Sequence, residues 1–334
     1  MRGASAVSQK VAWASGTHGT YLRMTDGRIW IPEQVAGAEG LDFRGVVAFS
    51  TDEAFLMSSG PGDQSRIYHT IDAGRHWELQ FTNKNPKGFF DSIVFWDRTH
   101  GLVLGDPVPD ENGTLKFELL MTEDGKNWKP IPSGQLPPAI EGEGAFAASN
   151  SCLAILSKDD PNIWFATGGK VARVFHTADR GRDWEVLDTP IVHGVDSEGI
   201  FSIAFRDATH GVIAGGDYKR PDRDGPNLAF TNDGGKTWTL SKIFPQSYYS
   251  AVAYDRKYGL SNSATGKAVE KGNEDSGLRI FLVGPKFIYD FRPPQNPIRM
   301  SPLKKSGLGF NAVRSYPTGG ALVVGSKGAI ATVP

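Results

Sequence analysis

The sequence contains a single cysteine, Cys152, and almost no net charge. One thiol excludes an internal disulfide and any cysteine-based zinc site, so we expect Cys152 to be a buried apolar residue. The formal net charge of −1 argues against a general nucleic-acid-binding protein, which would carry a basic excess. The sequence therefore predicts no nucleic-acid partner.

Long hydrophobic runs are also missing. The chain has no stretch of 18 apolar residues, which predicts no transmembrane segment. Residues 1–5 lack the apolar core of a signal peptide, and no signal peptide is visible. No 3.6-residue periodicity persists long enough to predict a substantial helix. Glycine and proline are abundant instead, with 40 and 21 residues scattered along the chain, which favours short strands joined by frequent turns.

An eight-residue segment recurs along the chain. Three copies follow the template T-x-D-x-G-x-x-W: T-I-D-A-G-R-H-W at 70–77, T-A-D-R-G-R-D-W at 177–184 and T-N-D-G-G-K-T-W at 231–238. Residues 121–128 keep the glycine and the tryptophan but have Glu123 where the template has aspartate, and residues 23–30 keep only Gly27 and Trp30. The five tryptophans are 47, 51, 56 and 54 residues apart, which indicates a structural repeat of about 52 residues.

Each residue of the template has a physical role in a tight turn. The glycine adopts positive φ, the aspartate accepts backbone N–H groups across the turn, and the tryptophan anchors the next strand. This template is the Asp-box, or BNR repeat, a turn between the third and fourth strands of a propeller blade. We therefore predict structural roles for Asp72, Gly74, Trp77, Gly125, Trp128, Asp179, Gly181, Trp184, Asp233, Gly235 and Trp238.

The same strand pattern surrounds each template segment. Around residues 231–238, four short apolar runs are separated by turns, which indicates one four-stranded unit. The fold class expected is all-β, a seven-bladed β-propeller of four-stranded antiparallel blades with Asp-box turns, in which the seventh blade has three strands. The predicted single domain spans 1–334, with blades at about 1–36, 42–83, 88–135, 141–192, 197–245, 248–303 and 308–334.

Two faces of this propeller differ in their chemistry. The Asp-box turns lie on one face, and the loops joining strands two and three, with the crossings between blades, lie on the other. The second face receives longer and more polar segments. The ligand-binding residues predicted there are Asp91, Asp106, Glu141, Glu143, Arg173, Asp217 and Tyr218.

Carboxylates that converge near the axis would raise one another's pKa, which is typical of functional sites. Asp91, Asp106, Glu143 and Asp217 are the candidates for such convergence. The alternatives are loop charges that are solvated or paired with arginine, and a calcium site, although no recognisable calcium-loop pattern is present. The two D-x-T-H-G segments at 97–101 and 207–211 are predicted to form turns, because histidines in separate blades are too far apart to share a metal. We predict no metal and no cofactor.

Several longer strings resemble a known family. They are F-F-D-S-I-V-F-W-D-R-T-H-G-L-V-L-G-D-P-V at 89–108, E-G-E-G-A-F-A-A-S-N at 141–150, A-R-V-F-H-T-A-D-R-G-R-D-W at 172–184 and G-G-D-Y at 215–218. With the Asp-boxes, they look like bacterial proteins related to the photosystem II stability/assembly factor. The resemblance covers nearly the whole chain. It implies a seven-bladed propeller that is periplasmic or secreted, with no established chemistry outside the photosynthetic members.

The photosynthetic members of that family bind proteins, but their basic patch cannot be matched here residue by residue. We therefore expect a non-catalytic, monomeric scaffold that binds a protein or a glycan on the face opposite the Asp-boxes. Asp-boxes also occur in sialidases and xyloglucan-type glycosidases. The usual Arg-Ile-Pro segment of sialidases is absent, so a hydrolase would instead use two carboxylates, for which Asp106 and Asp217 are the catalytic candidates.

Overall fold

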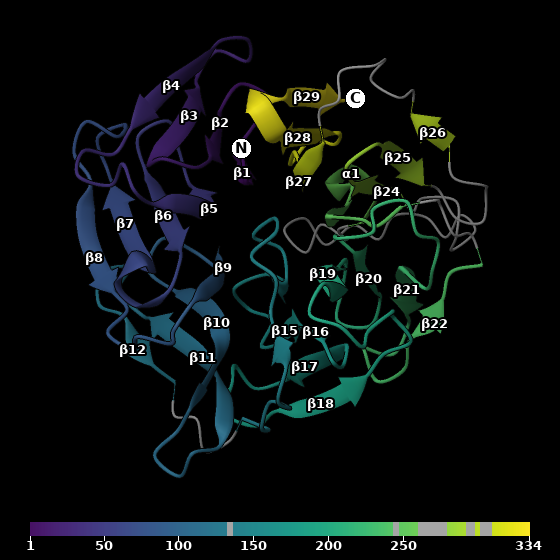
Figure 1. Ribbon diagram of the computed structural model, residues 1–334. Coiled ribbons are helices and arrows are strands. Elements are labelled where there is room, and N and C mark those ends of the chain that lie inside the picture. Colours follow the sequence, from purple (N-terminus) through teal and green to yellow (C-terminus); the bar gives the residue numbers. More distant parts are fainter. Residues whose placement is uncertain (132–135, 243–246, 260–278, 292–297, 301–308) are drawn as a thin grey trace.

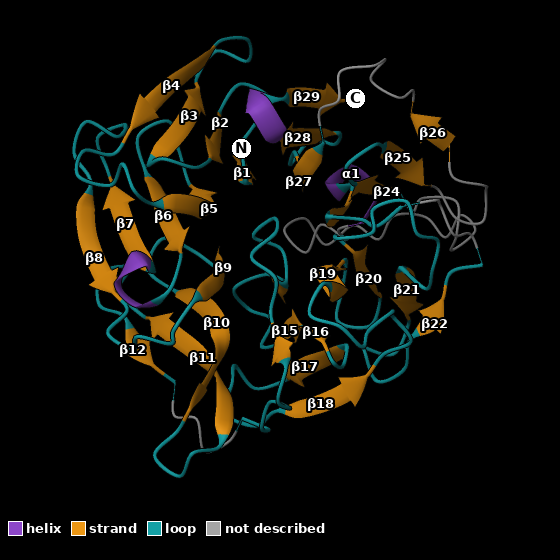
Figure 2. Cartoon of the chain, viewed as in Figure 1, coloured by secondary structure: helices purple, strands orange, loops and turns teal. Residues whose placement is uncertain are grey.

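A computed structural model describes the chain except for residues 132–135, 243–246, 260–278, 292–297 and 301–308. Seven antiparallel sheets are arranged around a central axis, with the first strand of each sheet nearest the axis and the last at the rim (Figure 1). Strands dominate the chain (Figure 2), and the described helices are short turns such as α1 (Arg256–Gly259). The predicted all-β, seven-bladed propeller is confirmed. None of the described helices is long and apolar enough to cross a membrane.

The first three blades are regular four-stranded sheets. Their strands are β1 (Gly3–Ala6), β2 (Ala12–Ser15), β3 (Thr20–Met24) and β4 (Trp30–Gln34) in blade 1, β5 (Asp42–Ala48), β6 (Ala54–Ser59), β7 (Arg66–Thr70) and β8 (Glu78–Thr82) in blade 2, and β9 (Phe90–Phe95), β10 (Gly101–Pro109), β11 (Leu115–Thr122) and β12 (Lys129–Pro130) in blade 3.

The remaining blades follow the same order, and blade 7 has three strands among the described residues. Their strands are β14 (Leu153–Ile155), β15 (Ile163–Ala166), β17 (Arg173–Thr177) and β18 (Glu185–Asp188) in blade 4, β19 (Glu198–Phe205), β20 (Gly211–Asp217), β21 (Leu228–Thr231) and β22 (Thr239–Leu240) in blade 5, β23 (Ala251–Tyr254), β24 (Ile280–Val283), β25 (Ile288–Phe291) and β26 (Ile298–Met300) in blade 6, and β27 (Phe310–Ser315), β28 (Ala321–Gly325) and β29 (Ile330–Val333) in blade 7.

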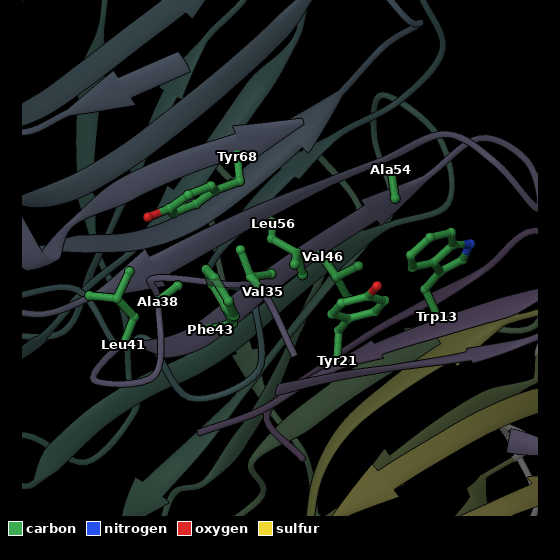
Figure 3. Packing of buried hydrophobic residues seen from close by; sticks show 10 residues of the cluster. All are labelled: Trp13, Tyr21, Val35, Ala38, Leu41, Phe43, Val46, Ala54, Leu56 and Tyr68. Atoms are coloured by element: carbon green, nitrogen blue, oxygen red, sulfur yellow. The ribbon is translucent and has the colours of Figure 1, made fainter. Parts of the chain in front are cut away.

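The core is divided into apolar clusters that lie between neighbouring blades. One cluster joins blades 1 and 2 and contains Trp13, Tyr21, Phe43 and Leu56 (Figure 3). A corresponding cluster occupies each of the other six interfaces, including the one between blade 7 and blade 1 that closes the ring. The five repeated tryptophans pack against these clusters, as expected from their size. Trp77, for example, meets Trp13 edge to face with ring centroids 6.2 Å apart.

A pair of glycines allows two strands to approach closely between blades 4 and 5. The short strands β13 (Glu143–Gly144) and β16 (Gly168–Gly169) precede blade 5 and join its sheet, because Gly168 pairs with Gly199 of β19. Gly199 has φ of +145°, and a Cβ there would lie 2.3 Å from the Gly168 Cα. Only glycine fits at position 199 in this close approach of two strands.

We predict that Gly199→Ala destabilises the protein by about 2–5 kcal/mol, because it adds both a backbone clash and an unfavourable φ. Thermal or urea unfolding measures the change. Gly40→Ala is the matched control, since a Cβ at Gly40 meets no heavy atom within 4 Å. Equal stability of the two variants would contradict the close approach of Gly199 to Gly168.

The repeated turns are stabilised by the bonds expected of their threonine and aspartate. In the turn at residues 70–77, the Thr70 hydroxyl donates to Asp72 and accepts from the Gly74 N–H at 3.0 Å, and Asp72 accepts the His76 N–H at 2.9 Å. Equivalent bonds are present around Asp179 and Asp233. Each aspartate therefore holds its own turn.

The two degenerate segments are shorter versions of this turn. Asp124, and not Glu123, accepts the backbone N–H groups of Lys126 and Asn127, and Thr122 bonds to Asp124. Asp26 likewise accepts the N–H groups that follow it. The interpretation that these segments lack the aspartate is wrong. The longer turns insert one residue of positive φ after the aspartate, such as Ala73, and the shorter ones omit it.

We expect Asp124→Ala to lower Tm by roughly 1–3 °C, because it removes acceptors that cap a turn. Glu123→Ala is the neighbouring control and should leave Tm unchanged. Differential scanning calorimetry distinguishes the two. A larger effect of Glu123→Ala would indicate that Glu123, and not Asp124, holds this turn.

Candidate functional site

Repeat-equivalent β-bulges occur on the innermost strands. The pairing of β5, β9, β19 and β27 with their second strands skips one residue each time. A bulge leaves its extra residue out of the ladder and re-aims its side chain. The skipped residues are Arg44, Asp91, Phe201 and Asn311, and a fifth bulge between β10 and β11 skips Asp106.

Three carboxyl groups gather on blade 3, and we call them the carboxyl cluster: Asp91, Asp106 and Glu118. Gly105 brings them together, because it pairs with Phe90 on one side and with Glu118 on the other. Asp91 is 1% exposed, and among the described residues neither of its carboxyl oxygens has a hydrogen-bond partner. Burial raises the pKa of Asp91 well above its usual range, nearby Asp106 raises it further, and Arg44 partly opposes the shift.

Each of the other two members of the carboxyl cluster accepts a hydrogen bond. Burial raises the pKa of Asp106 to about 6, although the Ala145 N–H donates to its Oδ1 at 2.9 Å and favours the charged form. Burial also raises the pKa of Glu118, which accepts a 2.9 Å bond from the Asn83 amide. Asp106 and Glu118 are half-buried, whereas Asp91 is fully buried.

The remaining predicted carboxylates are not part of this cluster. Glu143 accepts a 3.0 Å bond from Arg173 Nε and a 2.7 Å bond from the Thr167 hydroxyl. Asp217 is bound by Arg220, whose guanidinium also reaches Glu198. Burial opposes ionisation of Asp217, but hydrogen bonds from Arg220 and Ser197 outweigh it and lower the pKa.

The structure thus divides the predicted acidic residues between two environments. Asp91 and Asp106 lie together, whereas Glu143 and Asp217 are held in arginine pairs, the alternative raised from the sequence. Glu141 is exposed to solvent in the crossing before blade 4. No group of three His, Cys, Asp or Glu side chains in the described ranges is arranged to hold a metal ion.

Four aromatic side chains form an aromatic cluster on the face opposite the repeated turns: Phe146, Phe201, Tyr218 and Tyr248. The ring centroid of Phe201 lies 4.6 Å from Phe146 and 5.6 Å from Tyr248. Tyr218 lies 6.3 Å from both Phe146 and Phe201, and it is 46% exposed. The crossings on this face also expose Ile140 and Val195. The predicted ligand residue Tyr218 is therefore the exposed member of the aromatic cluster.

Residues 144–147 connect the aromatic cluster to the carboxyl cluster. Within this segment the Ala145 N–H binds Asp106, the Phe146 ring packs on Phe201, and the Ala147 carbonyl lies 3.5 Å from Arg44 Nη1. Consecutive residues thus contact both clusters. The two clusters are neighbours on one face of the propeller.

The D-x-T-H-G segments have the turn-forming role expected. Asp97 accepts the backbone N–H groups of Thr99 and His100, and Asp207 does the same for Thr209 and His210. Both segments join the first and second strands of their blades, on the face of the repeated turns. They contribute nothing to the opposite face.

Sequence reasoning missed Glu118, Arg44, Phe146, Phe201 and Tyr248. An alignment of the innermost strands as repeats would have found two of them. F-R-G at 43–45, F-D-S at 90–92 and I-F-S at 200–202 place Arg44, Asp91 and Phe201 at one position, directly after the same buried apolar residue. Glu118 lies on a third strand, and its proximity to Asp91 comes from strand pairing alone.

No family model matches the chain, and no curated protein matches it. Solved structures do. A structure described as YCF48 bound to D1 peptide aligns with a TM-score of 0.63 at 14% identity, covering 99% of this chain and 92% of that one. The WD40 β-propeller domain of Doa1 aligns with the same TM-score at 9% identity, covering 100% and 92%. The likeness is one of fold. It confirms the propeller part of the predicted resemblance.

The raised pKa of Asp106 predicts a pH-dependent contribution to stability. Its protonated form is favoured in the folded state, so the stability it contributes is complete below about pH 4 and is lost as pH rises through about 6. Asp106→Asn keeps the acceptor for the Ala145 N–H and cannot ionise. We expect the variant to be more stable than the wild type at pH 8 by roughly 1–3 kcal/mol and similar to it at pH 4.

Urea unfolding at pH 4, 6 and 8 measures this difference. Asp224→Asn, an exposed loop residue of the same charge, is the control and should change neither value. If Asp106→Asn is equally destabilised at every pH, the buried-carboxyl account of Asp106 is wrong.

Proposed function

We propose that the protein is a non-catalytic binding scaffold that holds a segment of a protein partner on the face opposite its repeated turns. The observation that carries this proposal is the aromatic cluster, built from blade 5, the crossing before blade 4 and the crossing after blade 5, with Tyr218 exposed at its edge. Exposed aromatic residues on a rigid frame contribute most of the binding energy in many protein interfaces.

The solved structures are consistent with a protein partner. The YCF48 structure is described as bound to a D1 peptide, so a propeller of similar fold holds a peptide. At 14% identity this likeness supplies only a precedent for the fold. The partner of the present chain is therefore proposed from its own surface, and we also propose the extracytoplasmic location that the family resemblance implies.

A glycan ligand and a glycosidase activity are the competing proposals. Aromatic rings also stack on sugars, so a glycan remains an outcome of the test. A glycosidase needs two available carboxyl groups that flank the scissile bond. Of the two candidates, Asp217 is occupied by Arg220 at 2.5 Å, which argues against its use as acid or nucleophile.

The test is a selection of a random dodecapeptide library displayed on phage against the immobilised protein, with a glycan array probed in parallel. We expect peptides that bind the wild type and lose at least tenfold in affinity on Tyr218→Ala. Loss of an exposed aromatic contact typically costs more than about 1 kcal/mol in binding. Ile71→Ala is the matched control, because Ile71 is 72% exposed but lies on the face of the repeated turns.

Peptides that bind Tyr218→Ala as well as the wild type, or that are lost on Ile71→Ala, would contradict the assigned face. Binding of glycans without any peptide would replace the protein partner with a glycan. Cleavage of a bound glycan that is abolished by Asp106→Asn would replace the scaffold with a hydrolase.

A further inference from the structure

We propose that the carboxyl cluster is a receptor for a cationic group, the ammonium of a lysine or the guanidinium of an arginine, presented by the partner segment. The inference rests on the proposed function and names the chemistry of the partner. Asp106 and Glu118 are the contacting groups, and Asp91 is the buried carboxyl group beside them.

The carboxyl group of Asp91 is buried. Buried carboxyl groups in folded proteins are nearly always hydrogen-bonded or ion-paired, because burying such a group alone is costly. Asp91 is 1% exposed, and neither of its oxygens is bonded within the described part of the chain. Elsewhere on this face Glu143, Glu198 and Asp217 are each satisfied by an arginine. The three acids on this face that pair with arginine are thus satisfied, whereas Asp91 has no bonded partner in the described part of the chain.

The carboxyl cluster brings three acidic groups together near Arg44. Arg44 is the cation that acts on Asp91, but its Nε donates to Asp42 at 2.8 Å and its Nη1 faces the Ala147 carbonyl. Arg44 is therefore already engaged by another carboxylate. Within the described residues, no cation is bonded to any of these three carboxyl groups from β9, β10 and β11. One ligand cation would supply the charge that this cluster lacks.

Part of the aromatic cluster lies beside the carboxyl cluster. Phe146 of the aromatic cluster directly follows Ala145, whose N–H holds Asp106. A basic side chain has an apolar stem and a charged end, so the stem can lie on the aromatic rings while the charge reaches Asp106. A bare metal ion would not use the aromatic rings, and the described acidic residues do not form a metal-binding group.

Proton release couples the two states of the cluster. Without a cation, burial raises the pKa of all three carboxyl groups and favours their protonated forms, with the pKa of Asp106 raised to about 6. On binding, a carboxyl proton passes to the buffer and the carboxylate pairs with the incoming cation. The titratable and charged groups that act on one another here are Asp91, Asp106, Glu118, Arg44 and the buried Cys152. Affinity for a cation therefore increases as pH rises from 5 to 8.

The test uses small probes that do not depend on a peptide: n-butylammonium and n-butylguanidinium chloride, with n-butanol as the neutral analogue. Binding is followed by NMR chemical shifts at constant ionic strength. We expect saturable binding of one or both cations to the wild type, at least fivefold weaker at pH 5 than at pH 8, and no saturable binding of n-butanol. The double variant Asp106→Asn, Glu118→Gln should lose at least tenfold in affinity.

Asp196→Asn is the control for surface charge, since Asp196 is exposed on the same face outside the cluster, and it should bind like the wild type. Single isosteric variants replace the double variant if the latter does not fold. Absence of saturable cation binding by the wild type, or equal binding by the Asp106 and Glu118 variants, overturns the proposal. If the wild type binds the cations but no peptide binds the face opposite the repeated turns, the cation receptor is supported and the proposed peptide scaffold is refuted. If peptides bind this face but the cations do not bind, the scaffold is supported and the cation receptor is refuted.

Discussion

Apolar packing between neighbouring sheets is the constraint on which the whole structure depends. Each of the seven interfaces between blades is filled by its own cluster, and the cluster between blades 7 and 1 closes the ring. Both faces of every sheet are covered in this way. The candidate functional groups come from loops, crossings, irregular positions in the strands and one strand residue paired beside such a position, Glu118.

The β-bulges supply those irregular positions. Arg44, Asp91, Phe201 and Asn311 lie where an innermost strand carries one residue more than its partner, and Asp106 lies at a similar place on β10. The backbone of one repeat thus offers the same position in several blades, and the residue type varies from cation to acid to aromatic. The blades therefore share a backbone position but differ in the side chain that it carries.

The sequence predicts the fold well because the fold repeats. The tryptophan spacing gives the blade length, and the glycines and aspartates of the turns identify where strands three and four meet. It predicts the site less well because pairing in space decides it. Asp217 and Asp91 look alike in the sequence, yet Arg220 three residues later binds the first, whereas no such partner is bonded to the second in the described structure. Glu118 enters the site only through its pairing opposite Gly105.

The same reasoning explains the misread turns. A fixed template assigns Glu123 to the aspartate position, but omission of one residue of positive φ shifts the role to Asp124. Local backbone geometry, which the template does not contain, made the difference.

The central claim is that the face opposite the repeated turns receives a partner. A crystal structure of the protein with a tightly bound peptide tests this most directly. The account predicts that the peptide crosses the aromatic cluster at Tyr218 and directs a basic side chain toward Asp106. A peptide seated on the repeated turns, or along the outer strands at the rim, would contradict it.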